Sequence, residues 1–285
     1  MKDFVAYING RFVHTARARV SALDRGLLYG DGLFETLRIY RGMPFALDAH
    51  LRRIRASGRR IGLTVPGAAK FWEGIIRDLL RRNRVGAADI ALRLTVTRGV
   101  GGDGLLPPSR VKPTILITLR SLDPDLPRLS KRGVRVTLLP FHPGIGALLA
   151  GVKTVDYLTA LIGKQLARRR GAYEGIYCTP VGQILEGTTS NIFIVRRRSL
   201  LTPPLAAGIL PGVTRHLVMG LAVRLGLSVR ERVLTTRDLE TADEAFLTST
   251  AIEILPIRSL DQRRIGDELR PVTRQLQTTF SGCHP

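Results

Sequence analysis

The sequence predicts an α+β fold organised in two domains. Segments with strand periodicity and segments with helix periodicity are interspersed along the 285 residues, without the regular strand–helix–strand repeat of a parallel sheet. Residues 121–127 interrupt this pattern with two prolines and two aspartates, which are residues that break helices and strands. We therefore expect an N-terminal α/β domain at residues 1–120, a linker at 121–133 and a C-terminal α/β domain at 134–285.

The first domain is expected to begin with a β-hairpin. Asn9-Gly10 lies between apolar segments at 4–8 and 11–13, and both turn residues tolerate a positive φ. Asp48 is placed to cap a helix that runs through Ile61. The other expected elements, predicted from the spacing of apolar residues, are strands at 35–40, 91–97 and 114–120 and a helix at 69–82.

The second domain is expected to mix short strands with three helices. Helices are predicted at 155–170, 211–225 and 271–280, where apolar residues align on one side. Pro211 at the start of the middle helix agrees with this, because the first turn does not use the N–H that proline lacks. The predicted strands are 134–139, 174–178, 183–185, 192–195 and 244–248.

Composition limits the class of protein. Hydrophobic residues make up 44% and charged residues 24% of the chain, which are ordinary values for a globular protein. The apolar stretch near the N-terminus is too short for a signal peptide, and no run of about 18 apolar residues occurs, so we expect a cytoplasmic protein without a membrane span. Cys178 and Cys283 are the only cysteines, and they predict neither a disulfide framework nor a metal site.

The formal charge of +21 raises nucleic-acid binding as an alternative function. Against it, the sequence has no basic tail, no ladder of aromatic residues, and no zinc-finger or RNA-binding signature. We therefore do not expect nucleic acid as a partner. A nucleic-acid-binding protein on an enzyme scaffold that has lost its activity stays open, and a strongly salt-dependent affinity for DNA would be its mark.

Lys153 is the strongest candidate for a catalytic residue. Only six of the 44 basic residues are lysines, and this one follows an apolar stretch that contains glycine. Burial disfavours an ammonium ion and so favours a nucleophilic amine. Glu186 follows 33 residues later, ahead of a small polar turn that ends at Asn191. A lysine that forms a Schiff base and an acid that pairs with a pyridinium nitrogen are what a protein contributes to pyridoxal phosphate chemistry.

The glycine-rich residues 98–104 suggest a dinucleotide site at first sight. They follow a predicted strand but lead into Leu105-Leu106-Pro107-Pro108 rather than into a helix. The structural context of the dinucleotide motif is therefore missing, and we set that interpretation aside.

Taken together, the motifs of the chain resemble those of the class IV aminotransferases, the fold-type IV pyridoxal-phosphate enzymes. The matching motifs occur in the family's order between residues 7 and 258. They are Asp24-Arg25-Gly26-Leu27-Leu28-Tyr29-Gly30-Asp31-Gly32-Leu33-Phe34-Glu35-Thr36, His50-Leu51-Arg52-Arg53-Ile54, Lys153-Thr154 with Tyr157, Glu186 with Asn191, Leu210-Pro211-Gly212-Val213-Thr214-Arg215, and Ser249-Thr250-Ala251-Ile252-Glu253. The resemblance implies the two-domain architecture of the D-amino acid aminotransferase-like enzymes.

The resemblance also implies roles toward pyridoxal 5'-phosphate (PLP). Lys153 would form the Schiff base and shuttle a proton between the cofactor and the substrate. Glu186 would keep the pyridine nitrogen protonated, and Tyr157 would hydrogen-bond the phenolic oxygen. The other implied cofactor residues are Arg52, Val213, Thr214 and Thr250 at the phosphate and Asn191 beside Glu186. The first turn of the helix predicted after Pro211 suits a phosphate, because its free N–H groups and dipole favour an anion.

At the substrate, the resemblance implies Tyr29, Phe34, Arg98, Asp103, Thr250 and Ala251, with Ala251 near the carboxylate. In the family, the loop that contains Asp103 lies over the active site and contributes to substrate choice. Typical D-amino acid aminotransferases and the lyases of the family carry a basic residue near this position, whereas an aspartate repels a carboxylate.

The expected function is therefore transamination between an amino acid and a 2-oxo acid, with a branched-chain or other apolar L-amino acid as the favoured donor. One alternative is 4-amino-4-deoxychorismate lyase, which releases pyruvate and 4-aminobenzoate with the same lysine and cofactor. A D-amino acid aminotransferase is the other. The resemblance further implies a homodimer, with small-molecule substrates as the only other partners.

Overall fold

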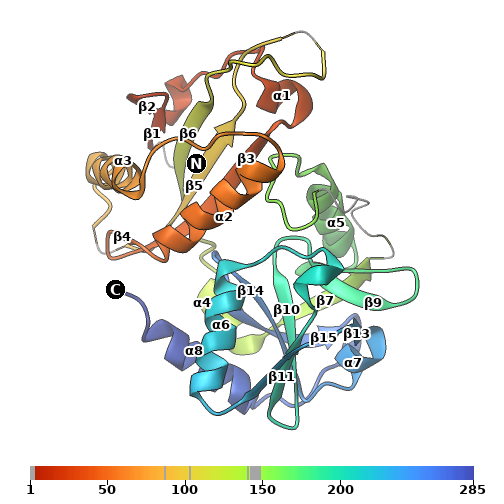
Figure 1. Ribbon diagram of the computed structural model, residues 1–285. Helices are drawn as coiled ribbons and strands as arrows, with labels where there is room; N and C mark the ends of the chain where they lie inside the picture. The colour runs from red at the N-terminus through yellow and green to blue at the C-terminus, as the bar shows by residue number, and fades with distance from the viewer. Residues whose placement is uncertain (1–3, 87, 103, 140, 142–148) are drawn as a thin grey trace. The chain divides into compact units, whose positions relative to one another are not determined.

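The computed structural model describes residues 4–86, 88–102, 104–139, 141 and 149–285 (Figure 1). It has the predicted α+β class and divides into two compact units. Unit 1 comprises Met1–Leu122, Val152–Asp156 and Pro285, and unit 2 comprises Asp123–Gly151 and Tyr157–His284. Among the described residues, no helix is long and apolar enough to cross a membrane.

Unit 1 is built on a six-stranded sheet in the order β2-β1-β6-β5-β3-β4. Every pair of neighbouring strands in this sheet is antiparallel. The strands are β1 Val5–Ile8, β2 Arg11–His14, β3 Gly32–Tyr40, β4 Met43–Pro44, β5 Ile90–Thr97 and β6 Thr114–Ser121. The predicted hairpin is confirmed, because β1 and β2 pair across Asn9 and Gly10, whose φ angles are 46° and 92°.

Two helices, α2 (Leu47–Arg60) and α3 (Ala69–Arg82), supply the apolar residues that pack with this sheet, and the short α1 (Arg25–Tyr29) precedes β3. Trp72 is fully buried in the resulting core. Asp48 is not the cap that we predicted: α2 begins at Leu47, and its N-cap is Ala46, which turns the chain with a φ of 53°. Asp48 lies instead in the first turn, where a carboxylate still favours the helix dipole.

Unit 2 is built on a ten-stranded mixed sheet in the order β12-β11-β10-β14-β15-β7-β8-β9-β13, with β16 paired to β15. Its strands are β7 Val134–Leu139, β8 Glu174–Cys178, β9 Gln183–Gly187, β10 Asn191–Arg196, β11 Ser199–Thr202, β12 Ser228–Glu231, β13 Leu234–Thr235, β14 Glu244–Ser249, β15 Glu253–Leu260 and β16 Arg263–Arg264. Its helices are α4 Leu126–Arg132, α5 Leu158–Arg169, α6 Val213–Arg224, α7 Thr236–Glu240 and α8 Pro271–Ser281. The core between them includes fully buried residues of the central strands, among them Val136, Ile192 and Leu255.

The segment that we predicted to be a linker contains the helix α4. Strand β6 ends at Ser121, and the two units divide between Leu122 and Asp123. Pro127 does not stop this helix, because it lies in the first turn, where a missing N–H is tolerated. The domain boundaries at 120 and 134 stay a prediction.

Residues 152–156 belong with unit 1, although our sequence-based division placed them in the C-terminal domain. Phe34 N donates to Lys153 O at 3.1 Å, and Val155 N donates to Gly32 O at 3.0 Å. Thr154 thereby lies opposite Leu33 in an antiparallel bridge. This pairing explains why helix α5 begins at Leu158 rather than at the predicted Val155.

Candidate active site

The Lys153 side chain lies against an aromatic ring of β3. Its Nζ is 4.3 Å from the centroid of the Phe34 ring, and the guanidinium carbon of Arg93 is 3.6 Å from the same centroid. A cation over an aromatic face is attracted by the ring's quadrupole. The structure thus brings together Lys153 and Phe34, which the sequence predicted as catalytic and substrate-binding residues.

A buried cluster of ionisable side chains joins Glu35, the residue after Phe34 in β3, to helix α2. Glu35 is 1% exposed, and its carboxylate accepts two hydrogen bonds from Arg53, at 2.7 and 2.6 Å. The His50 Nδ1 lies 2.7 Å from the same carboxylate. Burial raises the pKa of Glu35, but Arg53 and His50 outweigh burial and lower that pKa to about 2. Burial in turn lowers the pKa of His50, and the positive charges of Arg53 and Lys153 add to this effect.

The structure distinguishes the two arginines of the α2 motif. Arg52, which we predicted at the cofactor phosphate, is exposed on the helix surface. Arg53 is only 9% exposed, and its guanidinium is oriented by Glu35. Two parallel hydrogen bonds fix a guanidinium plane better than solvent contact does. We did not single out Arg53 or Glu35 from the sequence. The signal available there was a charged residue, Glu35, between the apolar residues of a predicted strand, because a buried carboxylate needs a basic partner.

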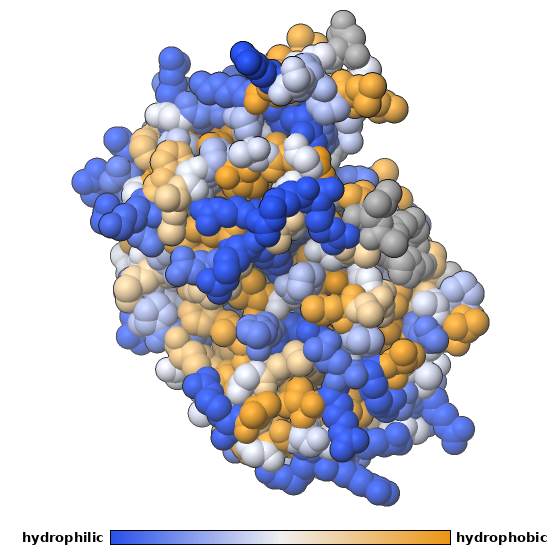
Figure 2. Space-filling view, viewed as in Figure 1, coloured by the Kyte–Doolittle hydropathy of each residue, from blue (hydrophilic) through white to orange (hydrophobic). Residues whose placement is uncertain are grey.

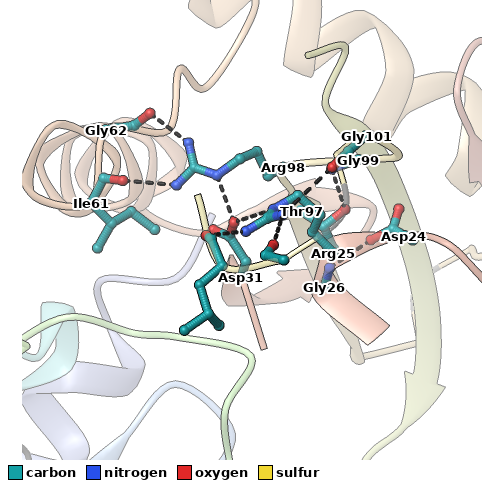
Figure 3. Close-up of polar contacts among 12 residues, drawn as sticks. Asp24, Arg25, Gly26, Asp31, Ile61, Gly62, Thr97, Arg98, Gly99 and Gly101 are labelled. Carbon is teal, nitrogen blue, oxygen red and sulfur yellow. Dashed lines mark hydrogen bonds and ion pairs between the residues drawn. The ribbon is translucent and has the colours of Figure 1, made fainter. Parts of the chain in front are cut away.

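Arg98, which we predicted at the substrate, is hydrogen-bonded to protein groups (Figure 3). Its Nε donates to Asp31 Oδ2 at 2.6 Å, and its Nη1 and Nη2 donate to the carbonyls of Gly62 and Ile61 at 2.7 and 2.8 Å. Tyr29, the second predicted substrate residue here, ends α1 and is 40% exposed. Asp103 lies outside the described residues.

In unit 2, Glu186 is fixed between a strand and the approach to helix α6. Its Oε2 accepts hydrogen bonds from Asn191 Nδ2 and from Leu210 N, both at 3.1 Å. Asn191 Nδ2 also donates to Leu210 O at 2.9 Å. Only glycine fits at position 212, because a Cβ there would come within 2.0 Å of Asn191 Oδ1. The predicted residues Glu186 and Asn191 are therefore neighbours, and their contacts place the start of α6.

The first turn of α6 contains Val213 and Thr214, both buried. Gly212 is the N-cap, and a glycine has no side chain with which to cap the first turn. The first N–H groups of a helix have no intrahelical acceptor. The turn predicted at the phosphate thus has donors and a positive dipole end for an anion.

The remaining predicted cofactor and substrate residues of unit 2 lie on short connections. Tyr157 is the N-cap residue of α5. Thr250 and Ala251 lie in the partly buried turn between β14 and β15. Burial and the negative charges of Glu174 and Glu186, with a smaller contribution from Tyr157, raise the pKa of Tyr177.

A second buried carboxylate supports the turn between Glu186 and Asn191. Glu174 is fully buried and accepts hydrogen bonds from the hydroxyls of Thr188, Thr189 and Ser190. Lys164 Nζ lies 3.3 Å from its Oε2. Because Lys164 is engaged in this ion pair, it is a weaker candidate than Lys153 for a reactive amine.

Comparison with known proteins identifies the class. A family model described as amino-transferase class IV matches residues 32–260, so the chain belongs to the class IV aminotransferases. These enzymes use PLP, and the protein is a PLP-dependent aminotransferase of class IV with the fold-type IV architecture.

The chain is similar to relatives from more than one branch of the family. A putative branched-chain-amino-acid aminotransferase of Methanocaldococcus jannaschii is 38% identical over 276 residues, which cover 96% of this chain and 94% of that protein. The aminodeoxychorismate lyase of Bacillus subtilis is 31% identical over 274 residues, covering 96% of this chain and 92% of its own. Among solved structures, the branched-chain amino acid aminotransferase of Escherichia coli matches with a TM-score of 0.91 at 30% identity, covering 99% of this chain and 95% of that one.

The side chains present fit PLP. A partly buried amine at Lys153 suits the aldehyde, and a carboxylate with two fixed hydrogen bonds at Glu186 suits the pyridinium nitrogen. The first turn of α6 without a side-chain cap suits the phosphate. When bound, PLP supplies the conjugated ring that accepts the electrons released at the substrate carbon.

Proposed function

We propose that the enzyme transfers the amino group of a branched-chain or other apolar L-amino acid to a 2-oxo acid. The observation that carries this proposal is the 38% identity over 96% of the chain to the putative branched-chain-amino-acid aminotransferase of M. jannaschii. Two features of the chain support it. The ring beside the Lys153 amine is the apolar Phe34, and Arg98 is engaged by Asp31 and two carbonyls rather than presented for a substrate carboxylate.

In this proposal, each residue has a role that its contacts suit. Lys153 binds the cofactor aldehyde and later takes up and returns the proton of the substrate carbon. Glu186, held by Asn191 and Leu210 N, keeps the pyridine nitrogen protonated. The phosphate is bound at Val213 and Thr214, by Thr250, and by an arginine of α2. For that arginine the ordered Arg53 is a better candidate than the exposed Arg52.

Tyr157 is proposed at the phenolic oxygen of PLP. Ala251, in the turn after β14, is proposed at the substrate carboxylate, where backbone N–H groups can donate to it. Tyr29 and Phe34 are proposed beside the substrate side chain.

The test begins with the purified protein, which should absorb visible light when PLP is bound. Borohydride should trap the cofactor on Lys153, as located by mass spectrometry, and Lys153→Ala should abolish both signals. Lys164→Ala is the matched control and should keep both. A donor screen with pyruvate and 2-oxoglutarate then ranks the amino acids. Trapping on Lys164 would contradict the assignment.

The second candidate function is 4-amino-4-deoxychorismate lyase, favoured by the 31% identity to the B. subtilis enzyme. The same lysine and cofactor serve both reactions, so the substrate decides between them. Release of pyruvate from aminodeoxychorismate that is faster than transamination of any amino acid would place the lyase first.

We also propose a homodimer in the cytoplasm. In support, unit 1 exposes large apolar side chains, and apolar surface is visible in Figure 2. Leu23, Leu27 and Leu28 are 64%, 69% and 49% exposed. Exposed apolar side chains in such number are typical of surfaces that another chain covers. Light scattering that reports a fully active monomer would refute the dimer.

A further inference from the structure

The carboxylate of Asp31 joins two arginine side chains (Figure 3). Its Oδ2 is 3.1 Å from Arg25 Nε and 2.6 Å from Arg98 Nε. The Arg25 side chain is 2% exposed, so it is removed from water and pairs with this carboxylate instead. Burial raises the pKa of Asp31, but hydrogen bonds from Arg98 and Arg25 outweigh burial, and the group stays ionised.

The far ends of the two guanidinium groups bind backbone carbonyls of two separate segments. Arg25 donates to Gly104 O at 2.9 Å and to Leu105 O at 2.6 Å, in the loop that follows β5. Arg98 donates to the carbonyls of residues 61 and 62, in the turn that follows α2. One carboxylate therefore connects the loop after β5 to the end of α2.

This network lies at the end of β3 to which the Lys153 segment is bound. Gly32, the residue after Asp31, accepts a hydrogen bond from Val155 N at 3.0 Å. A Cβ at Gly30, the residue before it, would lie 3.1 Å from the Asp156 Cβ. The guanidinium of Arg25 also packs on the Tyr29 ring, with its carbon 4.7 Å from the ring centroid.

We propose that Asp31 is a positioning residue, which acts through Arg25 and Arg98 to hold Tyr29 and the loop after β5 in place for substrate binding. This rests on the proposed function, because only then does the end of β3 beside Lys153 receive a substrate. Arg98 is accordingly a positioning residue as well, and not the direct substrate ligand that its place in the sequence suggested. Its three hydrogen bonds to Asp31 and to the turn after α2 account for that role.

The first test measures the loop without any cofactor or substrate. Leu105 is exposed, and thermolysin cleaves the bond before such a leucine, so cleavage between Gly104 and Leu105 reports how often the loop leaves its place. Asp31→Asn leaves Arg25 without its carboxylate, and cleavage at this bond should become about tenfold faster or more, since the loop opens more readily. Glu244→Gln is the matched control. It removes a buried carboxylate that binds Val272 N and Thr273 N in unit 2, and it should leave the loop cleavage unchanged.

The second test separates positioning from direct contact by a double-mutant cycle in the holoenzyme. Asp31→Asn and Arg98→Met should each raise the KM of the amino donor about tenfold, with the PLP affinity and the visible spectrum unchanged. If Arg98 acts through Asp31, the double variant is no worse than the more affected single variant, because both changes remove the same support.

Two results would overturn the proposal. One is loop cleavage at the parent rate in Asp31→Asn. The other is a full additional loss from Arg98→Met in the Asp31→Asn background, which would make Arg98 a direct ligand. If the parent protein binds no PLP and transfers no amino group, the proposed function fails on its own account. The rate of loop cleavage in Asp31→Asn, compared with that in the parent protein, still decides whether Asp31 holds the loop.

Discussion

Replacing Glu35 by glutamine should destabilise unit 1 by about 3 kcal/mol at neutral pH. The pKa of Glu35 falls from 4.5 to about 2 in the folded protein. A difference of one pKa unit corresponds to about 1.4 kcal/mol between the two protonation states, so the shift gives about 3 kcal/mol of stability. The figure agrees with the range of about 3–5 kcal/mol for losing one partner of a buried ion pair, and here Arg53 is the partner left behind.

The pH dependence has a definite sign. Because the folded pKa lies below the unfolded one, the stabilisation is complete above about pH 4.5 and is lost as the pH falls through about 2. About half or more of the difference between the parent and Glu35→Gln should therefore have disappeared at pH 3. Comparing the two proteins at each pH isolates Glu35 from the other carboxylates that titrate in this range.

Trp72 provides the assay, since it is the only tryptophan and is fully buried in the core of unit 1. Its fluorescence in denaturant titrations at pH 7 and pH 3 reports the unfolding of that unit. Asp89→Asn is the control, because it removes an exposed ion pair with Arg38, and it should cost at most about 1 kcal/mol. A cost of Glu35→Gln that is the same at both pH values would refute the electrostatic explanation.

Three further predictions concern other parts of the chain. Glu186→Gln should keep PLP bound but slow transamination about tenfold or more, as measured by single-turnover absorbance changes, because the charge opposite the pyridinium is lost. Arg53→Met should weaken PLP binding about tenfold in equilibrium dialysis, while the exposed Arg52→Met should have a much smaller effect; the reverse order would restore Arg52 as the phosphate ligand. Asp238→Asn removes the capping box at Thr235 and should cost about 1 kcal/mol at pH 7, measured by thermal unfolding. Since its hydrogen bond from Arg232 lowers the pKa of Asp238 to about 2, that cost should fade as the pH falls toward this value.

Local chemistry was sufficient to predict many elements of the fold. The Asn9-Gly10 turn, the helix at Ala69–Arg82 and the strand at Val134–Leu139 follow from turn residues and from apolar spacing, and the structure has them at the predicted positions. The strand at Glu253–Leu260 was missed. Of its neighbours in the sheet, β14 directly precedes it in the sequence, but β7, with which it pairs in parallel, ends at Leu139, and that long-range pairing is not visible in local periodicity.

The candidate site was predictable where a residue's role depends on its type and spacing. Glu186 and Asn191 were selected on that basis, and they are hydrogen-bonded. The sequence could not show which of two adjacent arginines, Arg52 or Arg53, is held by a buried carboxylate, because that depends on how α2 is rotated against β3. It also could not show that Arg98 is engaged by carbonyl groups of the turn after α2, more than 30 residues away in the chain.

The route of the chain has a consequence for how the protein can be synthesised and dissected. Unit 1 receives Val152–Asp156 after the chain has already contributed Asp123–Gly151 to unit 2. A fragment that ends at Leu122 would lack the segment that carries Lys153, and the N–H of Phe34 and the carbonyl of Gly32 would lose their partners. On the ribosome, the same strand edge stays open until residue 156 has emerged, and an open edge invites pairing with other chains. Residues 1–122 expressed alone should therefore be prone to self-association, whereas a chain that continues through Asp156 can close that edge from within.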